Sequence, residues 1–430
     1  MDKDLKNSHK IHFFGIGGIG ISALARMMIE EGKEVSGSDP TLSPVTEELA
    51  KLGARIIQGQ AASDVSEDVD LIIYSRALQI AVPELLEEIK SLGKKTLSYP
   101  EALSLVSRDK FTIAISGTHG KTTTTAMLGS ILVAGGLEPT IVVGSMLKDR
   151  NSNFVSGRSK YFVVEADEYL RSFLNLYPKI LVITNIDKDH LDYYKDLEDI
   201  QSAFKELALR VPEDGVIVYD STKPNVLPAL EGVKAKLVDY SKVGEVPKLR
   251  FPGEHNVENA RAALSVARVL GVEEAVSAEA LAKFAGTARR FEYKGETVQG
   301  ALFYDDYAHN PQKVRAALKG AREQFKDKKI VALFQPHLYS RTKLLLPEFA
   351  DSFGSADEVI VLPIYAAREK DDGSISSSIL AKEIADKGTK ALAMSFEEAR
   401  IYLGNILQTG DLLLTLGAGE AHKVGEKLMA

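Results

Sequence analysis

The chain contains the stretch Phe111-Thr-Ile-Ala-Ile-Ser-Gly-Thr-His-Gly-Lys-Thr122, and an apolar-rich run to about Ala134 follows it. The first half of this stretch is rich in apolar and β-branched side chains, which favours a buried strand. The second half, Gly117–Thr122, ends in the Gly-Lys-Thr of a phosphate loop. In such a loop the backbone N–H groups and the lysine bind phosphate oxygens, and the hydroxyl binds Mg²⁺. We therefore predict a strand, a loop and a helix of an α/β fold that binds a nucleoside triphosphate.

This loop departs from the general G-x-x-x-x-G-K-[ST] pattern, because Ile115 stands where the pattern has its first glycine. Threonine is a poor helix former, yet residues 122–125 are all threonine. A nucleotide site beside Thr122 and Thr123 explains at least these two. The predicted nucleotide-binding residues are Gly117, Thr118, His119, Gly120, Lys121, Thr122 and Thr123.

Another glycine loop, Gly15-Ile-Gly-Gly-Ile-Gly20, follows a predicted strand over 10–14 and precedes a predicted helix over 21–31. In this context G-x-G-x-x-G lets a diphosphate approach a helix N-terminus, and Asp39, after the next strand, can bond a ribose hydroxyl. Alternatively, the glycines serve only the packing of the helix on the strand. If the loop does bind a ligand, the motif does not distinguish NAD from another dinucleotide-like ligand such as a UDP-sugar. The predicted ligand-binding residues here are Gly15, Gly17, Gly18, Gly20, Asp39 and Ser75.

Apolar runs typical of strands alternate with helical patterns along the chain, which predicts parallel, doubly wound sheets. At about 150 residues per domain, 430 residues correspond to about three domains. We expect three consecutive α/β domains: a Rossmann-like domain over 1–109, a P-loop ATPase domain over 110–289 and a Rossmann-like domain over 290–430. The predicted strands are 10–14, 34–37, 71–74, 111–116, 161–164, 180–183, 215–219, 301–304, 330–334, 358–362 and 411–415.

The composition excludes several classes of protein. There is no cysteine, which rules out disulfides, thiolate metal sites and a cysteine nucleophile. With 53 Lys and Arg against 60 Asp and Glu, the net charge is −7, so we expect no nonspecific nucleic-acid binding. No apolar stretch approaches the ~20 residues of a membrane span, and the polar segment 1–10 predicts no secretion signal. We expect a cytoplasmic protein that is not inserted in a membrane.

Acidic and histidine side chains follow two of the predicted strands in the central domain. Glu165 comes directly after the strand over 161–164 and is our first candidate for a Mg²⁺ ligand. Asp167 and Glu168 could either support the metal ligands without binding the ion or contact the substrate. His190 follows the strand over 180–183, and it either binds a metal or caps its segment. The alternative for the acidic group is a solvated turn. The predicted metal ligands are Thr122, Glu165 and His190.

Polar residues also gather after strands of the last domain and at the start of a predicted helix over 256–270. In open α/β sheets ligands bind at the carboxyl edge of the strands, so His309, His337 and Arg341 together could hold a small carboxylate. Asn256 and Asn259 either cap the helix or contact an adenine edge, and spacing alone favours the cap.

Taken in order, these motifs resemble those of the Mur ligases. The resemblance covers Ile11 to about Gly419 and rests on these runs: Gly-Ile-Gly-Gly-Ile-Gly, Gly-Thr-His-Gly-Lys-Thr-Thr, Glu-Ala-Asp-Glu, His-Asn-x-x-Asn, Arg-Arg-Phe, Asp-Asp-Tyr-Ala-His and Gln-Pro-His-x-Tyr-Ser-Arg-Thr. It implies domains for a UDP-sugar, for ATP and for an amino acid, with ATP and Mg²⁺ as cofactors. It is greatest to the branch that joins L-alanine to the lactyl carboxylate of UDP-N-acetylmuramate through an acyl phosphate, in peptidoglycan precursor synthesis.

The resemblance also implies roles for single residues and a monomer or homodimer. The implied catalytic residues are Lys121, Glu165, His190, His309 and Arg341. The implied nucleotide contacts beyond the loop are His255, Asn256, Asn259, Arg290 and Asp306, and the implied substrate contacts in the last domain are Tyr307 and His337. Leu338 stands where many members of this branch have arginine, and Asn310 stands where a second histidine often occurs.

Two alternatives stay open at this point. A sister Mur ligase joins UDP-N-acetylmuramate to a preformed tripeptide for cell-wall recycling, and it shares both glycine loops and the form Glu165-Ala-Asp-Glu-Tyr169. The run from Gln335 to Thr342 favours the alanine enzyme. A nicotinamide-dependent oxidoreductase built on the first loop would leave Gly117–Thr122 unexplained.

Overall fold

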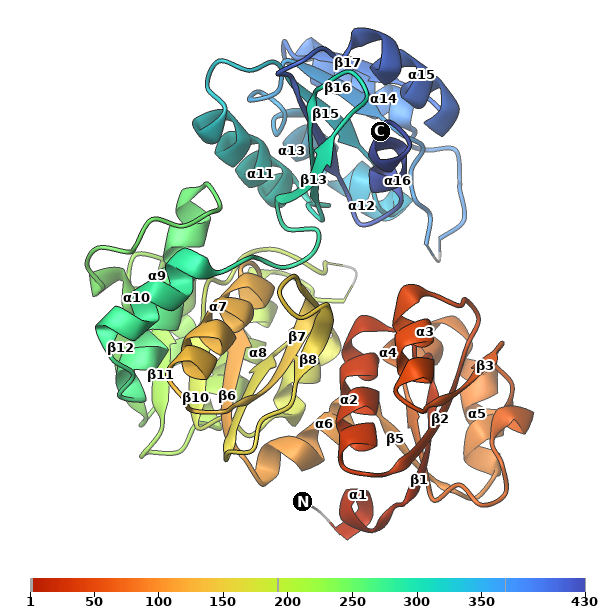
Figure 1. The fold of residues 1–430 in the computed structure, drawn as a ribbon, viewed down its shortest axis with the longest axis vertical. Coiled ribbons are helices and arrows are strands. Elements are labelled where there is room, and N and C mark those ends of the chain that lie inside the picture. Colours follow the sequence, from red (N-terminus) through yellow and green to blue (C-terminus); the bar gives the residue numbers. More distant parts are fainter. Residues whose placement is uncertain (1–2, 192, 368, 430) are drawn as a thin grey trace. The chain divides into compact units, whose positions relative to one another are not determined.

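The computed structural model describes residues 3–191, 193–367 and 369–429, with three sheets among them (Figure 1). The chain forms two compact units, Met1–Leu249 with Glu258–Ala285, and Arg250–Val257 with Gly286–Ala430. The first unit holds two of the sheets and the second unit holds the third. The three predicted α/β parts are thus confirmed as three sheets. Within the described residues, no helix is long and apolar enough to cross a membrane.

The first sheet has the strand order β3-β2-β1-β4-β5, and all its pairs are parallel. Its order places the carboxyl end of β1, and so the first glycine loop, at the middle of the sheet. The elements are α1 (Lys3–Asn7), β1 (Lys10–Phe14), α2 (Ile19–Glu30), β2 (Glu34–Asp39), α3 (Pro44–Lys51), β3 (Arg55–Gln58), η1 (Ala62–Asp64), β4 (Leu71–Tyr74), α4 (Arg76–Ala81), α5 (Pro83–Ser91), β5 (Lys95–Ser98) and α6 (Tyr99–Arg108).

The second sheet has the order β12-β11-β10-β6-β9-β7-β8, with β8 antiparallel at one edge. Strand β6, which leads into the phosphate loop, lies between β10 and β9, so the loop is flanked by the ends of both neighbours. The elements are β6 (Phe111–Ser116), α7 (Lys121–Ala134), β7 (Thr140–Leu147), β8 (Ser152–Val155), β9 (Tyr161–Glu165), η2 (Tyr169–Asn175), β10 (Ile180–Ile183), α8 (Leu197–Leu209), β11 (Val216–Tyr219), η3 (Pro224–Leu230), β12 (Lys236–Asp239), η4 (Tyr240–Lys242), α9 (Glu254–Val269) and α10 (Glu274–Lys283).

The third sheet, in the second unit, has the order β13-β14-β18-β15-β16-β17, with β13 antiparallel at one edge. The ends of β14, β18 and β15 therefore lie side by side. The elements are β13 (Glu292–Glu296), β14 (Leu302–Asp306), α11 (Pro311–Gln324), β15 (Ile330–Phe334), α12 (Tyr339–Leu344), α13 (Leu346–Ala350), β16 (Glu358–Val361), α14 (Ser377–Asp386), β17 (Lys390–Ala393), α15 (Phe396–Ile406), β18 (Leu412–Leu416) and α16 (Ala421–Glu426).

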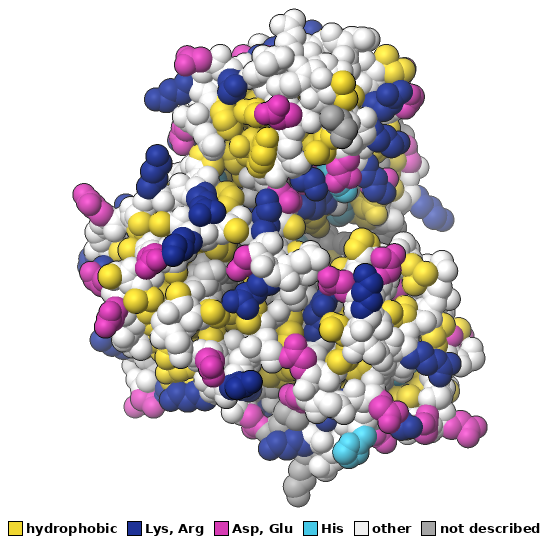
Figure 2. All heavy atoms as spheres, viewed as in Figure 1, with side chains coloured by type: hydrophobic (Ala, Val, Ile, Leu, Met, Phe, Trp, Pro, Cys, Tyr) yellow, Lys and Arg dark blue, Asp and Glu magenta, His cyan; other side chains and the backbone are white. Residues whose placement is uncertain are grey.

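The central strands form the cores of the sheets. Strands β4, β10, β15 and β18 are buried along their whole length, because helices cover both faces of these mainly parallel sheets. On the face shown in Figure 2, basic and acidic side chains are interspersed. The described residues of this face therefore show no broad region of positive charge that would mark an anion site.

Candidate active site

The first glycine loop is held by its own sheet. The backbone of Gly15 has a φ of +73°, and a Cβ there would lie 2.5 Å from Ser75 Oγ, so this position requires glycine. The N–H of Gly17 donates to Asp39 Oδ2 at 2.9 Å, and Thr41 N–H donates to Oδ1 at 3.1 Å. The structure thus brings Gly15, Gly17, Asp39 and Ser75 together, and both carboxylate oxygens of Asp39 hold backbone. Gly18 is the N-cap of α2, whose first N–H groups face the loop.

Gly20 reveals a residue that the sequence analysis missed. A Cβ at Gly20 would lie 3.1 Å from the ring and the hydroxyl of Tyr99. The last glycine of the motif therefore makes room for an aromatic ring from the first turn of α6. No pattern in the sequence pairs these positions, since they are on different helices.

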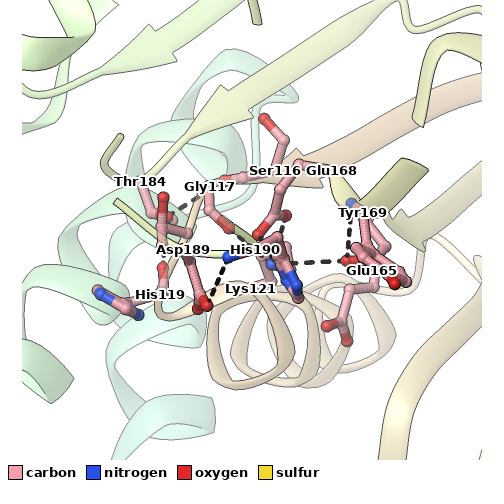
Figure 3. A network of polar contacts seen from close by, with 12 residues as sticks. Ser116, Gly117, His119, Lys121, Glu165, Glu168, Tyr169, Thr184, Asp189 and His190 are labelled. Atoms are coloured by element: carbon pink, nitrogen blue, oxygen red, sulfur yellow. Dashed lines mark hydrogen bonds and ion pairs between the residues drawn. The ribbon is translucent and has the colours of Figure 1, made fainter. Parts of the chain in front are cut away.

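The phosphate loop positions Lys121 through two oxygen acceptors. Its Nζ donates to Gly117 O at 2.8 Å and to Glu168 Oε2 at 2.6 Å (Figure 3). Glu168 is only 2% exposed, so this is a buried ion pair. Burial alone would lower the pKa of Lys121, but the carboxylates, Glu168 foremost, raise it above its ordinary value. Lys121 is thus a fixed positive charge at the N-terminus of α7.

A second carboxylate, that of Glu165, contacts the first turn of α7. Thr122 Oγ1 donates to Glu165 Oε1 at 3.0 Å, and the N–H of Gly144 in β7 donates to Glu165 Oε2 at 2.8 Å. The hydroxyl and carboxylate oxygens are hard donors of the kind that Mg²⁺ prefers. The two predicted metal ligands Thr122 and Glu165 therefore fit this ion.

The loop backbone is anchored to the end of β10. Thr184 Oγ1 donates to His119 O at 2.6 Å, and the N–H of His119 donates to Asn185 Oδ1 at 2.9 Å. The N–H of Asp187 donates to Thr118 Oγ1 at 2.9 Å. The positive φ of Gly117, +131°, and the close approach of Thr184 leave no room for a side chain at that glycine. These bonds fix the loop shape before any phosphate arrives.

His190 lies beside Glu168 rather than in isolation. Its Nε2 is 3.7 Å from Glu168 Oε1, its ring lies 4.7 Å from that of Tyr169, and its backbone adopts a φ of +53° (Figure 3). Ligand atoms of Asp167, Glu168 and His190 lie within 4.8 Å of one another, a grouping that can hold a metal ion. Asp167 and Glu168 are therefore candidate metal ligands themselves, whereas the sequence analysis gave them only supporting or substrate-binding roles.

The threonine run is explained in part by hydrogen bonds within the first unit. Thr124 Oγ1 donates to Asn259 Oδ1 at 3.1 Å, and Thr125 Oγ1 donates to the Lys121 carbonyl at 2.8 Å. A side chain on Gly120, whose φ is +85°, would overlap Asn259. Asn259 thus packs on the phosphate loop. Thr123 is half-buried on the same helix.

Asn256 and His255 belong to the second unit. The side chain of Asn256 donates to Pro252 O at 2.6 Å, so it fixes the turn before α9. His255 lies against Gly253, whose φ is +97°. Asn256 lies within the first turn of α9 and donates to a carbonyl, so this bond is not an N-cap, and the adenine contact stays a prediction.

The Arg-Arg-Phe run of the second unit folds against the ends of β14 and β18. Arg289, which the sequence analysis did not single out, donates to Asp305 Oδ2 at 2.8 Å and to Gly417 O at 2.7 Å. Arg290 lies over the Tyr307 ring at 5.5 Å. The carboxylate of Asp306 accepts two backbone N–H bonds, at 2.7 and 2.8 Å, and burial raises its pKa. Asp306 therefore shapes this loop.

The predicted amino-acid residues lie after β14 and β15, His309 and His337 on loops and Arg341 in α12. Arg341 donates to His337 Nδ1 at 3.3 Å, and the rings of His337 and His309 are 6.1 Å apart. His309 Nδ1 donates to the carbonyl of Tyr307 at 2.8 Å, which places the proton of the neutral ring on Nδ1. The structure thus brings His309, His337 and Arg341 together. Tyr365, a further aromatic residue, stacks on His337 at 5.6 Å.

The two departures from the family pattern have structural roles. Leu338 is 4% exposed with a φ of +69°, and its N–H donates to the Tyr365 carbonyl at 2.9 Å. Its side chain packs inward and offers no charge. Asn310 caps α11, because its side chain accepts from the N–H of Lys313 at 2.9 Å.

Comparisons with known proteins agree along the chain. Three family descriptions match: "Mur ligase family, catalytic domain" over residues 10–111, "Mur ligase middle domain" over 115–249 and "Mur ligase, glutamate ligase domain" over 289–419. The UDP-N-acetylmuramate–L-alanine ligase of Clostridium kluyveri is 40% identical over 455 residues, covering 99% of each chain. That of Caldanaerobacter subterraneus is 40% identical over 460 residues, covering 100% of this chain and 99% of the relative.

Solved structures give the same picture. The UDP-N-acetylmuramate–alanine ligase of Thermotoga maritima matches with a TM-score of 0.81 at 28% identity, over 97% of this chain and 98% of that one. A murein peptide ligase of Psychrobacter arcticus matches with a TM-score of 0.71 at 23% identity, over 98% of both chains, which shows a shared fold.

Proposed function

The chain belongs to the Mur ligase family, and from that premise we propose that it joins L-alanine to UDP-N-acetylmuramate at the expense of ATP. The observation that carries the choice of substrates is the end-to-end similarity to ligases of that name. The product would be a precursor of peptidoglycan. The first sheet would bind the UDP-sugar through Gly15, Gly17, Gly18, Gly20, Asp39 and Ser75.

The reaction proceeds in two displacements. An oxygen of the lactyl carboxylate attacks the γ-phosphorus of ATP, the bond to ADP breaks, and an acyl phosphate forms. The amine of L-alanine then attacks the acyl carbon, loses a proton, and expels inorganic phosphate to leave the amide. No protein nucleophile takes part, which agrees with a chain that lacks cysteine.

Charge repulsion is the main barrier to the first displacement, because a carboxylate must approach a triphosphate. Lys121 Nζ is held 2.6 Å from Glu168 Oε2, so its charge would already be in place for the phosphates and the side chain would not have to reorient during the reaction. Thr122 and Glu165 would hold Mg²⁺, which screens phosphate charge when bound. Asp167, Glu168 and His190 offer a further group of ligand atoms.

The second displacement needs an oriented amine. The guanidinium of Arg341 beside His337 suits the carboxylate of the amino acid. His309, with its proton on Nδ1, has Nε2 as the acceptor of its neutral ring and can take the proton that the amine loses. Because Leu338 packs inward and carries no charge, Arg341 is the one arginine of the run from Gln335 to Thr342 that would bind this carboxylate.

Release of ADP tests the proposal directly. The protein is incubated with ATP, Mg²⁺ and UDP-N-acetylmuramate, with L-alanine in one series and the L-alanyl-γ-D-glutamyl tripeptide in another. Release with L-alanine supports the proposal. Release with the tripeptide alone would instead assign the recycling reaction, whose enzymes share the form Glu165–Tyr169.

A Lys121→Ala variant tests the nucleotide site within the same assay. It should lose at least about a thousandfold in rate, because it removes the charge on the transferring phosphate. Lys234→Ala, an exposed lysine paired with Glu213 in the same unit, is the matched control and should behave as wild type. Binding of UDP-N-acetylmuramate should survive in both variants.

A further inference from the structure

Tyr99, the first residue of α6, packs on the first glycine loop. Its ring and hydroxyl pack on Gly20, at 3.1 Å from the position of a Cβ there. The same phenol is within electrostatic range of Glu165 and Asp167. Helix α6, which begins at Tyr99, packs against η2, the segment that directly follows Glu168. Tyr99 therefore packs on the loop for the sugar nucleotide, and its helix packs against the segment that follows the phosphate-transfer carboxylates.

The start of α2 is fastened to the second sheet independently of Tyr99. Asn153 in β8 is fully buried, and its side chain donates to Ser22 Oγ at 3.0 Å and to the Ile19 carbonyl. Asn151 donates to Glu48 Oε1 at 3.0 Å. These hydrogen bonds join the part with the first sheet to the part with the second sheet, so the Tyr99 hydroxyl is not needed to hold the two together.

The Tyr99 hydroxyl has no hydrogen-bond partner among the described residues, although its ring is packed and only partly exposed. The hydroxyl is not among the buried polar atoms that lack a partner, so solvent or a ligand can reach it. Burial, followed by the charges of Glu165 and Asp167, raises the pKa of Tyr99. The phenol is therefore a neutral O–H donor at neutral pH.

Resting on the proposed function, we propose that the Tyr99 hydroxyl binds the lactyl carboxylate of UDP-N-acetylmuramate and orients it toward the phosphate-transfer site. The diphosphate has its own donors in the first N–H groups of α2, because the N–H groups of residues 15–18 are bonded within the protein. The carboxylate of the substrate must reach the neighbourhood of Glu165 to be phosphorylated. A lysine or arginine there would pair with the protein carboxylates, whereas a neutral donor stays available for the substrate.

Tyr99→Phe removes the hydroxyl and keeps the ring on Gly20. The comparison uses two ligands that differ at the group in question: UDP-N-acetylmuramate, and UDP-N-acetylglucosamine, which lacks the lactyl group. We expect the Kd of the first, measured by calorimetry, to rise about tenfold, the effect of one hydrogen bond to a charged group. The Ki of the second, as a competitive inhibitor, should stay within about twofold.

A matched control and a stability measurement separate this role from a structural one. Tyr161→Phe, at the opposite end of β9 from Glu165 and packed on Phe111, should change neither constant. The Tm of Tyr99→Phe without ligand should equal that of the wild type, because the lost hydroxyl has no protein partner. A lowered Tm with equal weakening of both ligands would assign the hydroxyl to structure.

The remaining outcomes are also decisive. Unchanged binding of UDP-N-acetylmuramate to Tyr99→Phe would overturn the inference while leaving the proposed function intact. Equal weakening of both sugar nucleotides at unchanged Tm would place the hydroxyl on the diphosphate or the sugar, and would also overturn it. A wild-type protein that binds UDP-N-acetylmuramate but releases no ADP with L-alanine or the tripeptide would refute the proposed function instead.

Discussion

Gly144→Ala tests how Glu165 is held for Mg²⁺. The N–H of Gly144 donates to Glu165 Oε2 at 2.8 Å, and an added Cβ would lie 2.5 Å from that oxygen. An ordinary contact needs about 3.4 Å, so the carboxylate must move by roughly 1 Å. Such a movement takes its other oxygen away from Thr122, which now lies at 3.0 Å. Gly144 is exposed in β7 and has no positive φ, so its backbone accepts alanine.

The expected magnitude follows from the lost bond. A hydrogen bond to a charged group contributes about 1.5–3 kcal/mol, which corresponds to a tenfold to hundredfold change in an equilibrium constant. Because the carboxylate can partly recover by rotation, we expect the lower end: the half-saturating concentration of free Mg²⁺ should rise about tenfold. At saturating Mg²⁺ the rate should return close to that of the wild type. ADP release measured against free Mg²⁺ at saturating ATP gives both values.

Gly244→Ala is the matched control, because nothing lies near a Cβ at that position. It should leave the Mg²⁺ dependence unchanged. If Gly144→Ala also has the half-saturating Mg²⁺ concentration of the wild type, at an unchanged Tm, then the Glu165 position seen here is not the one that binds the ion. A loss of rate that high Mg²⁺ does not restore would likewise refute the reasoning.

Three further changes probe stability. Gly117→Ala combines a φ of +131° with overlap on Thr184 and should cost about 3 kcal/mol, seen in urea unfolding, whereas an unchanged midpoint would show that the loop is not fixed as described. Asp306→Asn leaves one acceptor oxygen for two backbone N–H groups and should cost about 1–3 kcal/mol; a stability equal to that of the wild type would contradict this. Burial lowers the pKa of His12 to about 4, so the unfolded chain binds more protons between pH 6.5 and 4, and stability falls by about 3 kcal/mol as the pH drops through that window. His12→Gln should flatten this part of the stability profile, and an unaltered slope would rule His12 out as its source.

The central strands were predictable because burial on both faces requires continuous apolar runs. The predicted strands over 10–14, 111–116, 180–183 and 330–334 have these bounds in the structure. Most of the strands that the sequence analysis missed are at sheet edges: β3, β5, β8, β12, β13 and β17. An edge strand is half exposed and carries polar residues, as in Lys236-Leu-Val-Asp239, so its pattern does not stand out from a loop. The exact domain boundaries stay predictions.

Local motifs alone predicted the chemistry proposed for this protein. Gly-Lys-Thr at 120–122 and the glycines from Gly15 to Gly20 predicted two loops for phosphate, because each motif stands between a predicted strand and a predicted helix. Tertiary structure decided which distant groups serve those loops: Glu168 on Lys121, Asn259 against Gly120, and Tyr99 on Gly20. The physical reason is that a side chain's partners are set by which strands pair and which helices pack, and no local spacing encodes a contact between residues 79 positions apart, as Gly20 and Tyr99 are.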